Sequence, residues 1–226
     1  MNNPIIVALD VPSASEALSL VDKLAGSVAM FKVGMELYAG EGAPLVKELL
    51  MRGGRVFLDM KFYDIPETVK RATARVAELG VSLLTVHGSV PVMQAAAEAR
   101  KGSALKVLAV TVLTSFDCQD LNDMGYFTSV SDLVDHRVWK AKEAGVDGVV
   151  CSPLEVKAVR ETLGADAVLV TPGVRSPGAA AGDQKRIATP AEAMRDGASY
   201  LVIGRQITRA SDPRAEAKKI LEEIAR

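Results

Sequence analysis

An acid, a base and a second acid follow one another closely at the end of an apolar segment. Asp59 and Lys61 lie at the end of the strand-like residues 56–61, and Asp64 follows just past that end. In an extended strand, side chains alternate between faces, which places Asp59 and Lys61 on the face of Phe57. Two carboxylates about 4 Å apart repel by about 4 kcal/mol at an effective dielectric near 20, so they need a cation between them. The spacing predicts a site with a preorganised lysine, or else a surface salt bridge worth about 0–1 kcal/mol.

The elements that must position these charges alternate regularly along the chain. Apolar, strand-like segments are predicted at 4–10, 28–34, 56–61, 82–87, 104–113, 148–152, 167–172 and 200–205. Helices are predicted between them at 13–24, 44–52, 66–79, 91–101, 130–144, 153–163, 190–196 and 213–224. Eight such units predict the α/β class, as a single-domain (β/α)8 TIM barrel over residues 1–226. An open doubly wound sheet fits less well, because no Gly-x-Gly-x-x-Gly turn follows the first strand.

Charged residues recur at the carboxyl ends of the first three predicted strands. Asp10, Lys32, Asp59 and Lys61 occupy these positions. All strands of such a barrel point their carboxyl ends at the same rim, which is where the active site of this fold lies. Alternating acids and bases can remain ionised in a partly dry pocket. The pattern favours an active site over a purely stabilising layer of salt bridges.

The last predicted strand carries a phosphate signal. Gly204 and Arg205 end it, and the loops after strands seven and eight of this fold often bind phosphate through backbone N–H groups. Arg205 adds a guanidinium that suits phosphate oxygens, although it could instead cap a surface. Two segments, 114–129 and 173–185, are longer than plain connections. Such loops build or cover sites, and we expect the same here.

Composition limits the possible partners and locations. The 226 residues carry a net charge of −1, which gives no general attraction to nucleic acid or to an anionic membrane. Two cysteines without a metal-binding spacing predict a reducing, cytoplasmic setting. The first residues lack a secretion pattern, and no apolar run approaches about 18 residues, so we expect neither secretion nor membrane spanning.

The sequence resembles the orotidine 5′-phosphate decarboxylase family through nearly its whole length. Residues 58–69 carry the most specific motif, Leu-Asp-Met-Lys-Phe-Tyr-Asp-Ile-Pro-Glu-Thr-Val. Six further motifs agree: Ala8-Leu9-Asp10, Phe31-Lys32-Val33-Gly34, Thr111-Val112-Leu113-Thr114-Ser115, Thr171-Pro172-Gly173-Val174-Arg175, Gly182-Asp183-Gln184-Lys185-Arg186 and Val202-Ile203-Gly204-Arg205. No catalytic position of the family departs from its pattern here.

The resemblance implies decarboxylation of orotidine 5′-monophosphate (OMP) to uridine 5′-monophosphate (UMP) without a cofactor or a metal. Lys61 would donate a proton to C6 of the pyrimidine, flanked by Asp59, while Lys32 completes the charged network. Asp64 would reach in from the partner subunit of a homodimer. The other positions that the resemblance implies in substrate binding are Asp10 and Lys32 for the ribose, Ile65 and Thr68 of the partner subunit, Thr114 for the pyrimidine, Pro172, Gln184 between ring and phosphate, and Arg175, Gly204 and Arg205 for the phosphate.

Two alternatives stay open at this stage. A related sugar-phosphate decarboxylase or aldolase shares a similar motif but uses Mg²⁺, held partly by a Glu near the end of strand two. Lys32 occupies that place here and would repel a metal. A non-catalytic, phosphosugar-binding barrel is the other alternative. The position of Lys61 between two acids argues against it, because carboxylates do not increase the affinity of a site for an anion.

Overall fold

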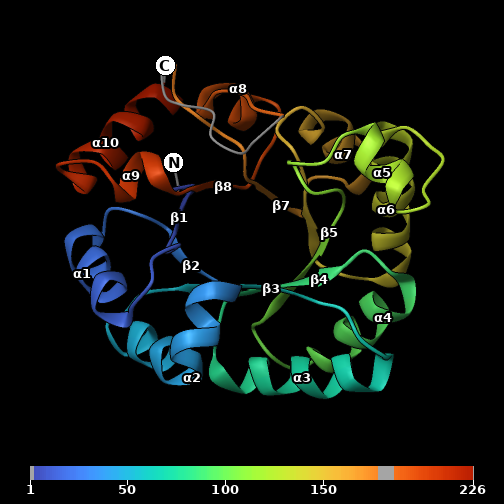
Figure 1. Cartoon of the computed structure of the whole chain (residues 1–226), viewed down its shortest axis with the longest axis horizontal. Helices are drawn as coiled ribbons and strands as arrows, with labels where there is room; N and C mark the ends of the chain where they lie inside the picture. The colour runs from blue at the N-terminus through green and yellow to red at the C-terminus, as the bar shows by residue number, and fades with distance from the viewer. Residues whose placement is uncertain (1–2, 178–185, 226) are drawn as a thin grey trace.

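Parallel strands close into a barrel in the computed structural model, which describes residues 3–177 and 186–225 (Figure 1). Within these residues each strand pairs with the next, and the last pairs with the first. The strands are β1 (Ile5–Ala8), β2 (Met30–Gly34), β3 (Val56–Phe62), β4 (Leu83–His87), β5 (Lys106–Val110), β6 (Gly148–Val150), β7 (Val168–Thr171) and β8 (Tyr200–Ile203). The predicted (β/α)8 TIM barrel is confirmed.

Helices surround the barrel on its outside (Figure 1). They are α1 (Ala14–Leu24), α2 (Met35–Met51), α3 (Pro66–Leu79), α4 (Val90–Ala99), α5 (Cys118–Asp123), α6 (Val130–Ala144), α7 (Val156–Leu163), α8 (Pro190–Arg195), α9 (Arg205–Thr208) and α10 (Pro213–Ile224). Local signals set several ends. Pro66 opens α3 and Gly80 closes it in the left-handed conformation, as Gly145 closes α6. Helices α3, α6 and α10 match their predicted bounds. Within the described residues, no helix is both long and apolar enough to cross a membrane.

Several boundaries differ from the sequence prediction, and two of them lie near the charged strand ends. Helix α2 begins at Met35 instead of residue 44, because Gly42 (φ 64°, ψ −157°) makes a kink between two helical halves and does not end the helix. Strand β8 ends at Ile203, and Arg205 begins the short helix α9. The prediction that Arg205 lies at a strand end is therefore wrong, although Arg205 still lies beside the carboxyl end of β8.

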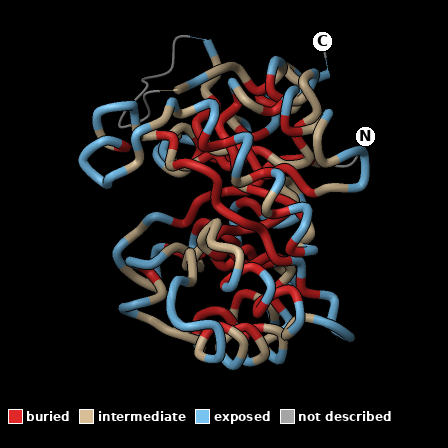
Figure 2. The backbone as a smooth tube through the Cα atoms, turned by 90° about the vertical axis from the view of Figure 1, so that its right-hand side faces the viewer, coloured by how far each residue is buried: buried red, intermediate tan, exposed pale blue. Residues whose placement is uncertain are grey.

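Two apolar layers hold the barrel together. Inside it, alternate strand residues pack against one another, among them Ile6, Met30, Phe57 and Leu108. The opposite faces of the strands pack against the helices in a larger cluster. Figure 2 shows the buried backbone running through the middle of the molecule, with exposed segments around it. Because side chains fill the barrel interior, a ligand must bind at its open rim.

Strand β3 is irregular where its charges begin. Leu58 pairs with Leu84, but the next pair joins Phe62 to Val86, so β3 uses two residues more than β4 over this interval. Lys61 lies in this bulge with a φ of 48°. Among the described residues, it is the only one other than glycine that has a positive φ. The expected strand through Lys61 is present, since β3 runs to Phe62, but its backbone is left-handed at Lys61 and not extended there.

Candidate active site

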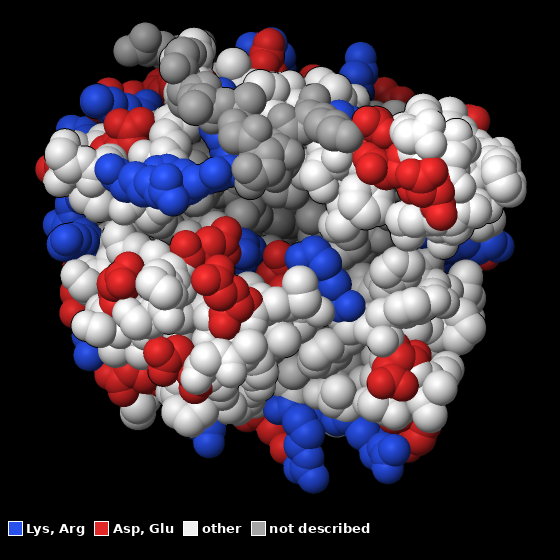
Figure 3. Space-filling model, viewed as in Figure 1, with Lys and Arg blue, Asp and Glu red and all other residues white. Residues whose placement is uncertain are grey.

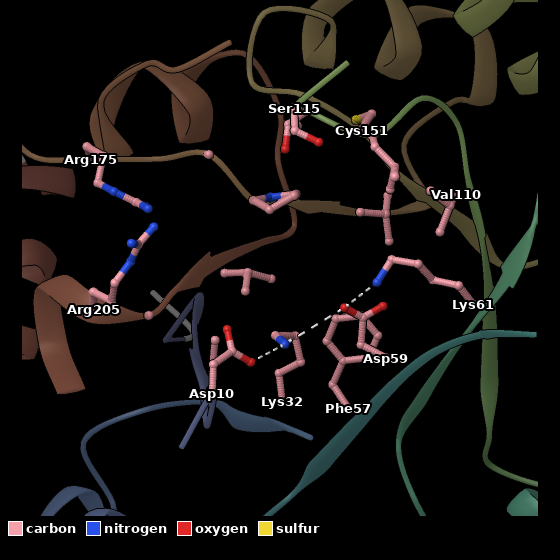
Figure 4. Close-up of a pocket in the computed structure, with 18 of the residues that line it drawn as sticks. Asp10, Lys32, Phe57, Asp59, Lys61, Val110, Ser115, Cys151, Arg175 and Arg205 are labelled. Carbon is pink, nitrogen blue, oxygen red and sulfur yellow. Dashed lines mark hydrogen bonds and ion pairs between the residues drawn. The ribbon is translucent and has the colours of Figure 1, made fainter. Parts of the chain in front are cut away.

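A cavity of about 420 Å³ opens at the carboxyl ends of the strands. Charged residues from several elements line it, including Asp10, Lys32, Asp59, Lys61, Arg175 and Arg205. Figure 3 shows the hollow in the middle of this face, with acidic and basic side chains gathered beside it. Asp59 and Lys61 both face the cavity despite the bulge, and Phe57 lies below them, as the sequence predicted (Figure 4).

Four of the lining residues form a chain of alternating charges. The Lys32 ammonium lies 2.8 Å from Asp10 Oδ1 and 3.9 Å from Asp59 Oδ2, and Lys61 Nζ lies 2.9 Å from that same Asp59 oxygen. The side chains of Lys32 and Asp59 are only 10% and 16% exposed, whereas that of Asp10 is 59% exposed. The structure thus brings together the four charges predicted at the strand ends. Their alternation offsets the cost of burying the inner pair.

Thr85 on β4 completes the surroundings of Asp59. Its hydroxyl donates to Asp59 Oδ1 at 2.8 Å and accepts the backbone N–H of Lys61 at 2.9 Å. The positive φ of Lys61 costs a non-glycine residue about 1–3 kcal/mol and persists only where the surroundings hold it. The sequence did not single out Thr85, because a threonine inside a strand carries no local signal of such contacts.

Two arginines converge on the other side of the cavity. The guanidinium groups of Arg175 and Arg205 point toward one another, opposite Lys61 (Figure 4). The backbone N–H of Arg175 donates to the Ala188 carbonyl at 3.0 Å, which holds this part of the loop in place. Gly204, at the start of α9, and Pro172 also line the cavity. Two converging guanidinium groups suit a bound phosphate.

Three predicted site residues lie elsewhere. Asp64, Ile65 and Thr68 are absent from the described residues that line the cavity. Asp64 is exposed, and its carboxylate accepts the backbone N–H of Ile65 at 2.6 Å. Ile65 and Tyr63 are 66% and 67% exposed. The structure therefore does not bring Asp64 together with Lys61 within one chain.

The part of the cavity lined by residues at or after the ends of β5 and β6 is less polar. Thr114 lines it as predicted, together with Ser115, Val150 and Cys151, which the sequence did not indicate. Ser115 could have been suspected, because it directly follows Thr114. Burial raises the pKa of the Cys151 thiol to about 12, so this group is a packing residue and not a nucleophile. Gln184 lies outside the described residues.

The arrangement suits chemistry that creates negative charge on a substrate held by a phosphate. A preorganised ammonium group stabilises such charge and can deliver a proton, while the arginines on the opposite side bind the phosphate. Within residues 3–177 and 186–225, no group of three or more His, Cys, Asp or Glu side chains could hold a metal ion.

Comparison with known proteins gives a consistent result. The sequence model described as "Orotidine 5'-phosphate decarboxylase / HUMPS family" matches residues 3–220. The chain is 51% identical over 221 residues to orotidine 5′-phosphate decarboxylase of Rhodopseudomonas palustris strain BisB5, covering 98% of this chain and 94% of the relative. It is 50% identical to that of Methylobacterium sp. strain 4-46, with 98% and 95% covered. A crystal structure of the Lactobacillus acidophilus enzyme of that name superposes with a TM-score of 0.88 at 36% identity, over all of both chains.

Proposed function

This chain belongs to the orotidine 5′-phosphate decarboxylase / HUMPS family, and we propose that it converts OMP to UMP without a cofactor, using Lys61 as the proton donor. It is a carboxy-lyase of pyrimidine biosynthesis. One observation carries the proposed mechanism. The chain of alternating charges ends in the Lys61 ammonium, on the side of the cavity opposite the two converging arginines.

The chemistry requires a positive charge aimed at one carbon atom. When the bond between C6 and the carboxylate breaks, CO₂ leaves and the electron pair stays on C6, where no carbonyl can delocalise it. The Lys61 ammonium stabilises this carbanion and then transfers a proton from Nζ to C6, which forms the C6–H bond of UMP. Asp59, 2.9 Å from Lys61 Nζ, keeps the ammonium in place and disfavours the adjacent substrate carboxylate in the ground state. The larger share of the effect falls to Lys61, because its charge is preorganised for the transition state.

Binding far from the reacting carbon supports turnover. Arg175, Gly204 and Arg205 hold the phosphate, and Asp10 and Lys32 hold the ribose hydroxyls. Contacts with the phosphate supply binding energy that can be used to orient the ring and exclude water. The remaining proposed contacts with the substrate come from Thr114, Pro172 and Gln184. Arg205→Ala should therefore lower kcat as well as affinity, and unchanged catalysis on OMP would contradict this role.

We further propose a cytoplasmic homodimer with shared sites. In it, Asp64, Ile65 and Thr68 reach the site of the partner subunit. Their position supports this arrangement, because Asp64 and Ile65 are exposed beside the rim and do not line the cavity of their own chain.

Mixing two inactive variants tests the shared site. Lys61→Ala and Asp64→Asn chains together form mixed dimers in which one site has both residues intact. In a random 1:1 mixture, half of the dimers are mixed and half of their sites are complete, so about a quarter of the wild-type activity should return. Continued inactivity, with mixed dimers shown to form, would refute the shared site. The matched control mixes Lys61→Ala with Asp59→Asn, whose two residues serve the same site, and should recover nothing.

A chelator separates this proposal from the Mg²⁺-dependent relative. Lys32 Nζ lies 2.8 Å from Asp10 and 3.9 Å from Asp59, so an ammonium group occupies the position between the two carboxylates. Turnover of OMP should therefore be unchanged in excess EDTA. Abolished turnover would favour the metal-dependent chemistry.

A further inference from the structure

Thr85 is fully buried and binds two parts of the catalytic motif at once. It lies in the middle of β4, with 0% of its surface exposed. Its hydroxyl contacts Asp59 Oδ1 at 2.8 Å and the backbone nitrogen of Lys61 at 2.9 Å. Both contacts join residues more than twenty positions apart in the chain, so they exist only in the folded barrel.

The directions of these hydrogen bonds follow from the donors available. The Lys61 backbone N–H can only donate, so the Thr85 oxygen accepts from it, and the single hydroxyl hydrogen is directed to Asp59. Asp59 then has separate donors for its two oxygens, Thr85 for Oδ1 and the Lys61 ammonium for Oδ2. This pairing fixes the rotation of the carboxylate, and hydrogen bonds linked in this way strengthen one another.

The same hydroxyl supports the backbone at Lys61. The β3–β4 register passes from Leu58–Leu84 to Phe62–Val86, which leaves Thr85 opposite the bulge in β3. No residue between Leu58 and Phe62 is paired with β4 in the ladder, and the Thr85 side chain accepts the Lys61 N–H at this bulge. The contact therefore helps to hold the left-handed conformation of Lys61 (φ 48°).

We propose that Thr85 is a positioning residue for the decarboxylation: its hydroxyl sets the Asp59 carboxylate and the Lys61 backbone so that the Lys61 ammonium is aimed at the reacting carbon. The inference rests on the proposed roles of Lys61 and Asp59. Thr85 itself does not line the cavity among the described residues, so it acts through these two neighbours.

Two substitutions at Thr85 separate the hydroxyl from the shape of the side chain. Thr85→Val keeps the volume and removes both hydrogen bonds, whereas Thr85→Ser keeps the hydroxyl and removes a methyl group. The chain also offers a matched control. Thr73 on α3 is equally buried, with 0% exposed, and its hydroxyl has no hydrogen-bond partner among the described residues. Thr73→Val therefore makes the same chemical change without disturbing the catalytic motif.

The test measures kcat and KM for OMP. Each rate is divided by the concentration of sites that bind UMP, so that unfolded protein does not lower the measured kcat. We expect Thr85→Val to lower kcat about 10- to 100-fold, because a small displacement of a catalytic group has effects of this size. KM should change less than about threefold, since the ribose and phosphate contacts are intact, and a purely structural residue would not give this split. Thr85→Ser should recover most of kcat, and Thr73→Val should match the wild type.

Other outcomes overturn the inference. If Thr85→Val keeps kcat within about threefold of the wild type, the hydroxyl does not position the site. If Thr85→Ser loses as much as Thr85→Val, the methyl group is what matters and the proposal is again wrong. Should Thr85→Val not fold, Thr85→Ala compared with Thr85→Ser gives the same contrast. A wild-type protein that does not turn over OMP would instead refute the proposed function, so the two failures are distinguishable.

Discussion

Replacing Asp59 by asparagine should destabilise the folded chain much more than the same change at Asp10. Both carboxylates contact Lys32, and both substitutions keep the size of the side chain. Asp59 is 16% exposed and lies 2.9 and 3.9 Å from two ammonium groups, whereas Asp10 is 59% exposed and lies 2.8 Å from one. Comparing the two variants therefore measures how much burial and the second lysine add to the stabilisation that a carboxylate gives in the chain of alternating charges.

The expected magnitudes follow from these distances. At an effective dielectric near 20, the attraction of Asp59 is about 6 kcal/mol to Lys61 at 2.9 Å and about 4 kcal/mol to Lys32 at 3.9 Å. Desolvation offsets much of this, and removing one partner of a buried pair costs about 3–5 kcal/mol in practice. Because the Lys61 side chain is 30% exposed, we take the lower end, about 3 kcal/mol. For Asp10, the solvent reduces the loss to about 0–1 kcal/mol.

Thermal and urea unfolding without ligand test this difference. For a chain of this size, 3 kcal/mol corresponds to a fall in Tm of roughly 6–12 °C, and the Asp10→Asn variant should lose no more than about 4 °C. Equal losses in the two variants, or a loss below about 1 kcal/mol for Asp59→Asn, would refute the reasoning. Equal losses would mean that burial and the second lysine add nothing to the stabilisation. A small loss for Asp59→Asn would mean that solvent screens the charges so well that the free enzyme does not hold Lys61 in a preorganised position.

Further predictions concern packing and titration. Gly148→Ala should abolish folding or lower Tm sharply in circular-dichroism melts, because a Cβ atom would lie 1.9 Å from the Val168 carbonyl oxygen; a variant with wild-type Tm would contradict this. Burial raises the pKa of Cys151 to about 12, so at pH 8 an alkylating reagent followed by mass spectrometry should modify the exposed Cys118 and leave Cys151 intact until the protein unfolds. Equal labelling of both thiols in the folded protein would count against the buried position. Burial, and to a lesser extent the charge of Arg137, lowers the pKa of His87, so the unfolded chain binds a proton more readily than the folded one, and stability should fall as the pH drops below about 6.5. Urea titrations across this range should show a weaker decline for His87→Gln, and an unchanged decline would show that other groups cause it.

Local signals explain why much of the fold was predictable. Pro66 and Gly80 mark the ends of α3 through their own backbone preferences, so its bounds could be predicted from the sequence. The start of α2 could not, because Gly42 and Pro44 are typical of helix ends but here form a kink inside one. Whether a glycine ends a helix or bends it depends on the packing of the residues on either side of it.

The candidate site likewise contains residues that the sequence predicts and residues that only the structure reveals. Asp10, Lys32, Asp59 and Lys61 were predicted to meet because barrel topology alone brings strand ends to one rim. Thr85 was not, because its role depends on the register between β3 and β4 and on a bulge that the sequence does not announce. A one-residue change of register turns every side chain to the other face of the sheet. Contacts between side chains on neighbouring strands therefore cannot be predicted before the register is known.

The bulge also bears on the proposal that residues of one short motif serve two sites. Along a regular strand, side chains keep alternating between the same two faces, so a charged motif continues to supply the same surfaces. The left-handed backbone of Lys61 interrupts this alternation, and within five residues Pro66 starts α3 on the outside of the barrel. Asp59 thus stays with Lys61 in the cavity while Asp64 becomes exposed at the surface. In the proposed dimer, this divergence gives each Lys61 a second carboxylate from the neighbouring chain without burying two like charges on a single strand end.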